Sequence, residues 1–319
     1  MNVLISSAGR RVSLVEIARQ AVKARETVAR VIATDADPGM SAACHVADAS
    51  FAVPRISDAD FLGELHAIAV ANGVRLIIPT LDTELAALAG VRDAWAEDGI
   101  HVAVSDADLI GVFRDKLRTV DFFTERGFAV PATLTDDTTF PRFIKPLAGS
   151  LSADIHMCGQ TSDVHQSWWD RRAYLHQEAV DQSRFTEFTV DIYCDRDGRT
   201  RCAVPRRRIE VRGGEIAKGR TEHGTLEQVI FDRLAHIPGA RGCLTAQFFV
   251  PNDSPDPGEI LAIEVNARFG GGYPLTDKAG AHYVDWLLGE YLDGREPMTT
   301  HDWTEGLTML RFDDAVFVP

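Results

Sequence analysis

The chain has 319 residues, of which 45% are hydrophobic and 25% are charged, as is ordinary for a folded protein of one to three packed units. Its formal net charge of −14 disfavours a protein that binds nucleic acid, because that affinity rests on accumulated positive charge. The sequence has no apolar run of the roughly 20 residues that a membrane-spanning helix needs, and no basic leader before its first apolar segment. The five cysteines lie far apart, without the paired spacing of a metal site, so we expect reduced thiols in a cytoplasmic protein.

Short apolar runs alternate with helical patterns over the first hundred residues. Strands are predicted at residues 2–6, 28–34, 75–79 and 100–104, and helices at residues 13–24, 60–71 and 84–98. This alternation is typical of a parallel sheet with helices on both faces. Ligands of such sheets bind beyond the carboxyl ends of the strands, which are expected near residues 7–11, 35–39 and 80–84.

A parallel sheet of this kind also suits a dinucleotide-binding oxidoreductase. The first turn, however, contains one glycine, Gly9, where that class uses three to let the backbone approach a pyrophosphate. Asp35 after the second strand suits a ribose hydroxyl, but an aspartate at a strand end is common. The sequence therefore disfavours nicotinamide binding and leaves it as an alternative.

From about Leu109 the sequence pattern changes. A helix is predicted over residues 118–126, a strand over 142–145, several strands of period two beyond Leu175, and a helix over 282–292. Residues 252–258, rich in proline and aspartate, are expected to form a hairpin loop. Together these elements predict an antiparallel, strand-rich body with helices outside it, which is an α+β arrangement.

The strongest chemical signal is the segment from Glu264 to Arg268, which reads Glu-Val-Asn-Ala-Arg. Since alternate residues of a strand share a face, one face is expected to be apolar, with Leu261, Ile263 and Val265. The opposite face is expected to carry Ala262, Glu264, Asn266 and Arg268. Carboxylate and amide oxygens are ligands that Mg²⁺ accepts, and an arginine can contact a phosphoryl group. A solvated polar face with a local Glu–Arg pair is the alternative interpretation.

Two further strands and a loop strengthen the first interpretation. In the predicted strand, Gln247 lies on the face opposite to Ala246 and Phe248, and so offers another oxygen on a polar face. Another predicted strand alternates polar and apolar residues, and its polar members are Glu187, Thr189, Asp191 and Tyr193. Lys145 ends a predicted strand and precedes a serine-containing loop whose backbone N–H groups can face phosphates. Only five of the 33 basic residues are lysines, which makes the position of each one informative.

The order of these features resembles the ATP-grasp superfamily, in the short single-module form of its carbamoyl-phosphate-synthase-like type. The resemblance runs from the turn at residues 7–11 to about Trp286. Its most specific segments are residues 115–116, 144–146, 177–178, 187–191 and 264–272. It implies an α/β parallel-sheet (pre-ATP-grasp) domain at residues 1–110, followed by an α+β two-lobed ATP-grasp fold. The small lobe would span residues 111–175, and the large lobe with the metal site residues 176–319.

The resemblance also implies roles for individual residues. ATP phosphates would bind Lys116, Lys145 and the loop residues Ser150 and Ser152. The adenine would meet the hinge at Glu178, Ala179 and Val180, and the ribose would meet Glu187. Magnesium would bind Gln247, Glu264 and Asn266, whereas Arg268 and Lys145 would act in catalysis. Two departures from the family pattern are visible: Leu151 and Ala153 stiffen a loop that usually carries more glycine, and Gln247 stands where glutamate is common.

The activity that the resemblance implies is that of an ADP-forming carboxylate–amine ligase, which uses ATP and Mg²⁺ to make an acyl phosphate that an amine then attacks. A small-molecule kinase and a non-catalytic ATP-binding protein are alternatives that share the same ATP-binding residues. An amino acid or similar small carboxylate is the expected substrate, together with an amine, and assembly as a homodimer stays open. The candidate substrate-binding residues are Arg10, Asp82, Glu84, Arg206, Arg208, Lys218 and Gly271.

Overall fold

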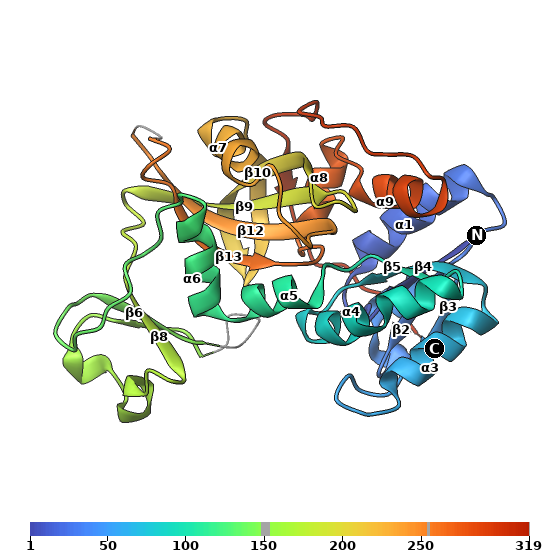
Figure 1. Cartoon of the computed structure of the whole chain (residues 1–319), viewed down its shortest axis with the longest axis horizontal. Helices are drawn as coiled ribbons and strands as arrows, with labels where there is room; N and C mark the ends of the chain where they lie inside the picture. The colour runs from blue at the N-terminus through green and yellow to red at the C-terminus, as the bar shows by residue number, and fades with distance from the viewer. Residues whose placement is uncertain (148–153, 254–255, 319) are drawn as a thin grey trace.

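The computed structural model describes residues 1–147, 154–253 and 256–318. Three sheets organise this part of the chain, and Figure 1 shows a large body with the smallest sheet set apart at one end. The N-terminal sheet and the six-stranded sheet share two hydrophobic clusters, so these two sheets and their helices pack as one body.

The first sheet is parallel and has five strands in the order β3-β2-β1-β4-β5. Its strands are β1 (Asn2–Ser6), β2 (Val31–Asp35), β3 (Ala49–Ala52), β4 (Val74–Pro79) and β5 (His101–Val102). One face is covered by α1 (Val12–Arg25) and α2 (Ala42–Val46), and the other by α3 (Phe61–Ala71) and α4 (Asp82–Glu97). The predicted parallel α/β arrangement is therefore confirmed.

The differences from the predicted strand boundaries have local causes. β2 begins at Val31 and not at residue 28, because a turn in which the Ala29 N–H donates to Glu26 O comes first. The sequence pattern missed β3, which is a four-residue strand at the sheet edge with alternate side chains exposed. Short edge strands carry few of the buried apolar residues on which a strand prediction depends.

The second sheet is antiparallel and has six strands in the order β13-β12-β9-β10-β11-β14. Its strands are β9 (Phe185–Cys194), β10 (Thr200–Arg212), β11 (Glu215–Thr221), β12 (Gly242–Pro251), β13 (Leu261–Asn266) and β14 (Thr308–Leu310). Against one face pack α5 (Ala107–Arg114), α6 (Lys116–Glu125) and α7 (Thr225–Arg233), and against part of the other pack α8 (Tyr273–Lys278) and α9 (Tyr283–Leu292). The predicted α+β body is confirmed, and the uncovered part of the second face carries the polar residues of β9, β12 and β13.

A β-bulge in β13 changes which residues share a face. Gln247 pairs with Glu264 but Phe248 pairs with Ala262, so Ile263 is an additional residue in this strand. Ala262 was expected beside Glu264 and instead lies on the opposite face, where it is 2% exposed within the hydrophobic core. Past the bulge the alternation is regular, and Glu264 keeps the predicted common face with Asn266.

The third sheet lies apart from the main body in Figure 1. It is antiparallel in the order β7-β6-β8, with strands β6 (Arg142–Pro146), β7 (His156–Cys158) and β8 (Tyr174–Glu178). Its core is small, since only Ile144, Cys158 and Val164 are buried in its cluster. The predicted domain boundaries at residues 110 and 175 fall inside α5 and β8. The division into three units stays a proposal, and its boundaries are better placed at the ends of these two elements.

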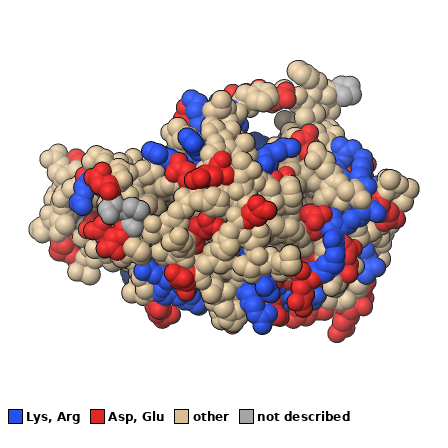
Figure 2. Space-filling view, turned by 90° about the horizontal axis from the view of Figure 1, so that it is seen from above, with Lys and Arg blue, Asp and Glu red and all other residues tan. Residues whose placement is uncertain are grey.

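Three further features of the chain bear on its chemistry. All five cysteines are buried and free, and burial raises the pKa of the Cys194 and Cys202 thiols to about 12. No helix in the described part of the chain is long and apolar enough to cross a membrane. On the face shown in Figure 2, acidic and basic side chains are mixed and do not gather into one basic surface.

Candidate functional site

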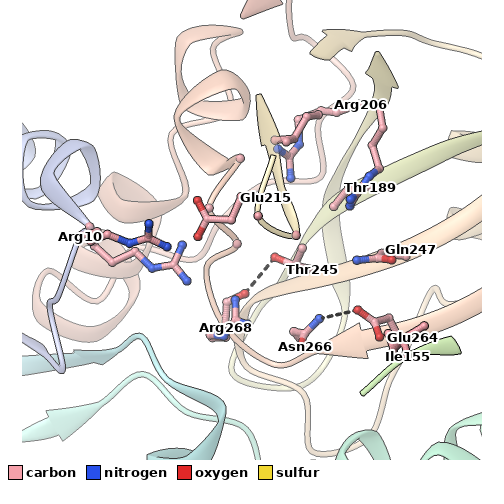
Figure 3. A pocket seen from close by; sticks show the side chains of 18 of the residues that line it. Arg10, Ile155, Thr189, Arg206, Glu215, Thr245, Gln247, Glu264, Asn266 and Arg268 are labelled. Atoms are coloured by element: carbon pink, nitrogen blue, oxygen red, sulfur yellow. Dashed lines mark hydrogen bonds between the residues drawn. The ribbon is translucent and has the colours of Figure 1, made fainter. Parts of the chain in front are cut away.

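A cavity of about 150 Å³ lies between the uncovered face of the six-stranded sheet, the turn after β1 and the end of β6 (Figure 3). Charged and polar side chains form most of its wall: Arg10, Arg11, Lys116, Thr189, Arg206, Arg208, Glu215, Thr245, Gln247, Glu264, Asn266 and Arg268. Six of these side chains are basic and two are acidic. An acidic protein thus has a locally positive cavity, which attracts anions.

The three predicted metal ligands lie together on one wall of the cavity. The register of β12 and β13 places Gln247 opposite Glu264 and Thr245 opposite Asn266. Asn266 Nδ2 donates to Glu264 Oε1 at 3.4 Å, so these side chains point toward each other (Figure 3). One carboxylate and two amide oxygens suit Mg²⁺, which takes further oxygens from phosphates and water. Within residues 1–147, 154–253 and 256–318, no three His, Cys, Asp or Glu side chains lie close enough together to hold a metal ion elsewhere.

Two of the five lysines lie beside this wall. Lys116 is the first residue of α6, and Lys145 lies in β6 with 5% of its surface exposed. Burial lowers the pKa of Lys145 to about 8, although Glu264 acts to raise it. Burial also lowers the pKa of Lys116, and Glu264 again opposes the effect. In the described chain the lysine ion pairs are those of Lys23 and Lys218. Lys116, which lines the cavity, and Lys145, buried beside it, therefore keep their ammonium groups for anionic oxygens.

The predicted adenine hinge begins at the end of β8. The backbone N–H groups of Glu178 and Ala179 donate to the carbonyl oxygens of Ala132 and Pro141, at 2.9 and 3.3 Å. Val180 is the member of the predicted hinge whose N–H has no backbone acceptor among the described residues. An adenine contact through this hinge would therefore use the Val180 N–H and carbonyl oxygens, since the other two N–H groups are already bonded.

Glu187, the predicted ribose contact, forms an ion pair with Arg208, in which Oε1 lies 3.2 Å from Nε. Burial raises the pKa of the Glu187 carboxyl, and Arg208 opposes this change. Arg208 also donates to Thr189 Oγ1 at 3.2 Å, which holds this candidate substrate residue against the sheet face. The predicted phosphate contacts Ser150 and Ser152 lie outside the described residues.

Arg268 lies at the cavity and is held from the N-terminal part of the chain. Its Nε and Nη2 donate to Asp82 Oδ2 at 3.0 and 2.7 Å, and its carbonyl oxygen accepts from Thr245 Oγ1 at 2.9 Å. The two side chains of the ion pair are only 12% and 14% exposed. Asp82, a predicted substrate contact, thus holds Arg268 in this structure.

Comparison with known proteins agrees with this fold. Residues 3–103 match the family model described as "PylC-like, N-terminal domain". Residues 182–315 match the family model described as "ATP-grasp in the biosynthetic pathway with Ter operon". Residues 182–315 are thus an ATP-grasp domain. The family and the two-part architecture predicted from the sequence are therefore confirmed.

Solved structures share the fold of this ATP-grasp protein over nearly its whole length. One is the biotin carboxylase domain of Hydrogenobacter thermophilus 2-oxoglutarate carboxylase, which was solved with MgADP, ADP and bicarbonate. It is 15% identical to this chain, and its TM-score is 0.70. The match covers 96% of this chain and 73% of that chain. The ADP complex of N5-carboxyaminoimidazole ribonucleotide synthetase is 16% identical, with 94% and 78% covered and a TM-score of 0.67. Identities this low show the fold alone. No curated protein sequence matches the chain.

Two candidate substrate residues of this ATP-grasp protein lie away from the cavity. Glu84 is 0% exposed and accepts hydrogen bonds from the N–H groups of Thr80 and Leu81, at 2.8 and 3.0 Å, and from Ser7 Oγ, at 2.8 Å. Burial raises the pKa of Glu84, and these hydrogen bonds lower it. It closes the N-terminus of α4 and is not part of the cavity wall, so the structure gives Glu84 a capping role. Lys218 is exposed, lies 2.5 Å from Glu210 and is likewise not part of the cavity wall.

Arg206 is 0% exposed and still forms part of the cavity wall. Its Nη2 donates to Asp191 Oδ1 at 2.7 Å, and Asp191 also accepts from the hydroxyls of Thr245 and Thr276. Its Nε and Nη1 have no hydrogen-bond partner among the described residues. A buried donor without an acceptor is unfavourable, so these two groups can be satisfied by an oxygen of a bound ligand.

The sequence prediction missed two charged residues of the cavity wall, Arg11 and Glu215. Arg11 adjoins the candidate Arg10, and only the fold shows that both reach the cavity. Glu215 begins β11 after a tight turn. Because the β10–β11 pairing contains register shifts, a period-two pattern does not predict which face of the sheet Glu215 lies on. Glu215 packs on Gly271, where a Cβ would lie 2.7 Å from the Glu215 carboxyl carbon. Gly271, a candidate substrate residue, thus makes room for a charged neighbour.

Proposed function

We propose that this ATP-grasp protein is an ADP-forming ligase that joins a small carboxylic acid to an amine, using ATP and Mg²⁺. The position of Glu264 carries the proposal. It lies opposite Gln247 and accepts a hydrogen bond from Asn266. Its negative charge also acts to raise the pKa of both Lys116 and Lys145. The proteins of similar fold support it, since their structures were solved with ADP, MgADP or bicarbonate.

In this proposal ATP lies between the small sheet and the six-stranded sheet. Lys116 and Lys145 bind the outer phosphates, because their ammonium groups are without a paired carboxylate in the described chain. The adenine meets the hinge near Val180, and Glu187 accepts from the ribose hydroxyls. Gln247, Glu264 and Asn266 would hold magnesium, which would neutralise phosphate charge.

A carboxylate is a poor electrophile because neither of its oxygens is a good leaving group. In the first step a carboxylate oxygen attacks the γ-phosphorus of ATP, the bond from that phosphorus to the β–γ bridging oxygen breaks, and ADP leaves. In the second step the amine nitrogen attacks the acyl carbon, the C–O bond to the phosphoryl group breaks, and inorganic phosphate leaves while the nitrogen loses a proton. The products are ADP, phosphate and an amide, or a peptide when both substrates are amino acids.

The side chains of the cavity position the reactants and balance charge. Arg268, held by Asp82, faces the phosphoryl group in transit and the acyl phosphate, where negative charge is concentrated. Arg206 offers its free Nε and Nη1 groups to a carboxylate oxygen of the acid. Lys145 lies in a buried position, where its charge acts on the phosphates with little screening by water.

ADP release over a panel of small acids, with and without a mixture of amines, tests the proposal when the condensed product is detected by mass. Glu264→Gln is expected to reduce turnover about 10²- to 10³-fold, as does the loss of one electrostatic contact in other enzymes. Glu259→Gln is the matched control, because Glu259 is exposed in the loop before β13. Thermal unfolding of both variants checks that the fold is kept.

Three outcomes would contradict the ligase. Wild-type turnover by Glu264→Gln would remove the metal site from the mechanism. ADP release that needs an acid but never an amine, with a phosphorylated product, would identify a small-molecule kinase. Tight ATP binding without ADP release for any acid and amine pair would identify a non-catalytic ATP-binding protein.

A further inference from the structure

One end of the cavity carries more positive charge than the described chain neutralises. Figure 3 shows Arg10 entering from the turn after β1, on the side of the cavity away from Gln247 and Glu264. Four arginines gather at this end and are called the arginine group: Arg10, Arg11, Arg268 and Arg311. The carboxylates that accompany them are those of Asp82 and Glu215.

Both of these carboxylates are already bound. Asp82 accepts two hydrogen bonds from Arg268, at 2.7 and 3.0 Å, and Glu215 lies 2.7 Å from Arg311 Nη1. The other two members of the arginine group, from the turn after β1, form no ion pair with any residue that the structure describes. Two guanidinium charges at this end therefore remain for a ligand.

Two other groups around the same space are without an acceptor. α1 follows the turn directly, and its first helical turn contains no acidic residue and no capping side chain. The positive end of its dipole thus adds to the charge of the turn. Arg206 lines the same cavity with 0% exposure, and its Nε and Nη1 are without partners in the described chain. These are independent signs that an anionic ligand completes this end.

The arginine group is distinct from the lysines that the proposed function assigns to ATP. The charges that act on Arg11 come from Arg268, Glu215, Asp82 and Arg311. Those that act on Lys145 come from Glu264 and Lys116. Figure 3 places Arg10 on the opposite side of the cavity from Gln247 and Glu264, so the cavity has two positive regions, one beside the predicted metal ligands and one at the turn after β1. The phosphates of a nucleotide held at the first region leave the second region for the other substrate.

We propose that the acid activated by this enzyme carries a second anionic group, a carboxylate or a phosphate, that binds Arg10 and Arg11 while its reacting carboxylate faces Arg268. The inference rests on the proposed ligase function and narrows its substrate to dicarboxylic acids, acidic amino acids and small acids that bear a phosphate. A neutral analogue leaves the charge of the half-buried Arg11 guanidinium unmatched, and this mismatch discriminates against it.

Calorimetry of the full chain with MgADP tests the inference with pairs of acids that differ in one charge. The pairs are L-aspartate and L-asparagine, L-glutamate and L-glutamine, succinate and succinamate, and O-phospho-L-serine and L-serine. In at least one pair we expect the acid with the second charge to bind about 10- to 100-fold more tightly, because hydrogen bonds to a charged group contribute that much to affinity. The phosphoserine pair separates a phosphate site from a carboxylate site.

Arg11→Gln should lower that ratio by a similar factor, because it removes the charge and keeps a polar side chain of moderate length. Arg30→Gln is the matched control and should leave the ratio unchanged, since Arg30 is exposed in the same part of the chain. Thermal unfolding of both variants shows whether the fold is kept, and Arg10→Gln replaces Arg11→Gln if the latter does not fold.

The outcomes separate the inference from the function on which it rests. Equal binding within every pair, or binding of none of these acids, overturns the inference. If the neutral members also promote ADP release with amines, the ligase function survives that result. If an acid with two charges binds tightly, loses its preference in Arg11→Gln and never yields ADP with any amine, the site is supported and the ligase function is wrong.

Discussion

Arg268 and Asp82 are 186 residues apart in the sequence, and yet the Nε and Nη2 atoms of the arginine both donate to one oxygen of the aspartate, at 3.0 and 2.7 Å. Asp82 is the first residue of α4, within the part of the chain that matches the PylC-like model. Arg268 follows β13, within the part that matches the ATP-grasp model. The N-terminal sheet therefore helps to orient a side chain of the proposed catalytic site.

Asp82→Asn should lower kcat and leave the KM for ATP nearly unchanged. The amide keeps the shape of the side chain but removes the charge that holds the Arg268 guanidinium, so the arginine is less well placed in the transition state. We expect a loss in kcat of about 10- to 100-fold, which steady-state ADP release measures. Asp93→Asn on the same helix is the control, because the Asp93 side chain is 87% exposed and such surface pairs contribute little. A full kcat, or an equal rise in the KM for ATP, contradicts the positioning role.

Period-two reasoning placed the predicted metal ligands on one wall because alternation survives in any regular antiparallel pairing. Gln247 and Glu264 were each placed on a polar face from local sequence, and the register brings these faces together. The same reasoning misplaced Ala262, since a bulge adds one residue without any change in the hydrophobic pattern. Strand faces were thus predictable up to the point where the pairing becomes irregular.

Residues near turns were predicted less well, because their surroundings come from distant segments. Whether a carboxylate at a helix start caps the helix or faces a cavity depends on what packs against it. Glu84 is enclosed by Ser7 and the start of its own helix, whereas Glu215 is held at the cavity by Arg311. Neither environment can be deduced from neighbouring residues in the sequence.

Lys145→Met should make the protein more stable and inactive. The pKa of Lys145 is about 8 in the folded chain and 10.5 as its ordinary value, because burial disfavours the ammonium. Below pH 8 Lys145 is protonated in both the folded and the unfolded chain, and the folded chain bears the full free-energy cost of burying the ammonium group. Between pH 8 and 10.5 the folded state loses its proton first, so this contribution raises stability as pH rises. Methionine removes the charge, and we expect a gain on the order of 1–3 kcal/mol at pH 7.

Urea unfolding of wild type and Lys145→Met at several pH values checks this prediction. The difference between the two proteins is the quantity to compare, since burial also raises the pKa of Tyr273 and Cys194 and makes the whole chain less stable at alkaline pH. The difference should be largest near neutral pH and should shrink above pH 8. Lys278→Met, at an exposed lysine, should show no such dependence. A difference that does not vary with pH contradicts the buried-charge explanation.

Gln247→Glu should reduce the Mg²⁺ concentration needed for half-maximal turnover. The variant places a second carboxylate opposite Glu264, and added ligand charge increases the affinity of an oxygen site for a divalent cation. Without Mg²⁺ the two carboxylates repel, so the metal-free variant should also unfold at a lower temperature. A Mg²⁺ titration of ADP release measures the first effect, with Gln228→Glu on the exposed face of α7 as control. An unchanged Mg²⁺ midpoint would exclude residue 247 from the metal site.

Gly272→Ala should weaken binding of the acid by displacing Arg206. A Cβ at this position would lie 1.8 Å from Arg206 Nη1 and 2.7 Å from Ile216 Cγ2, so the guanidinium has to move although Asp191 holds its other end. We expect the dissociation constant of the acid to rise about 10- to 100-fold, with a loss of about 1–3 kcal/mol in the free energy of unfolding. The affinity for ATP should change little, because Lys116 and Lys145 are not touched.

A second glycine shows whether an added methyl group alone has this effect. Gly63 lies in α3, and no heavy atom would be within 4 Å of a Cβ there, so Gly63→Ala should raise stability by about 0.5–1 kcal/mol and leave acid binding unchanged. Calorimetry with the tightest-binding acid compares the two variants. If Gly272→Ala binds that acid as well as wild type does, the free Nε and Nη1 groups of Arg206 do not contact the substrate. A loss confined to Gly272→Ala, with ATP binding intact, places the acid against the Arg206 guanidinium.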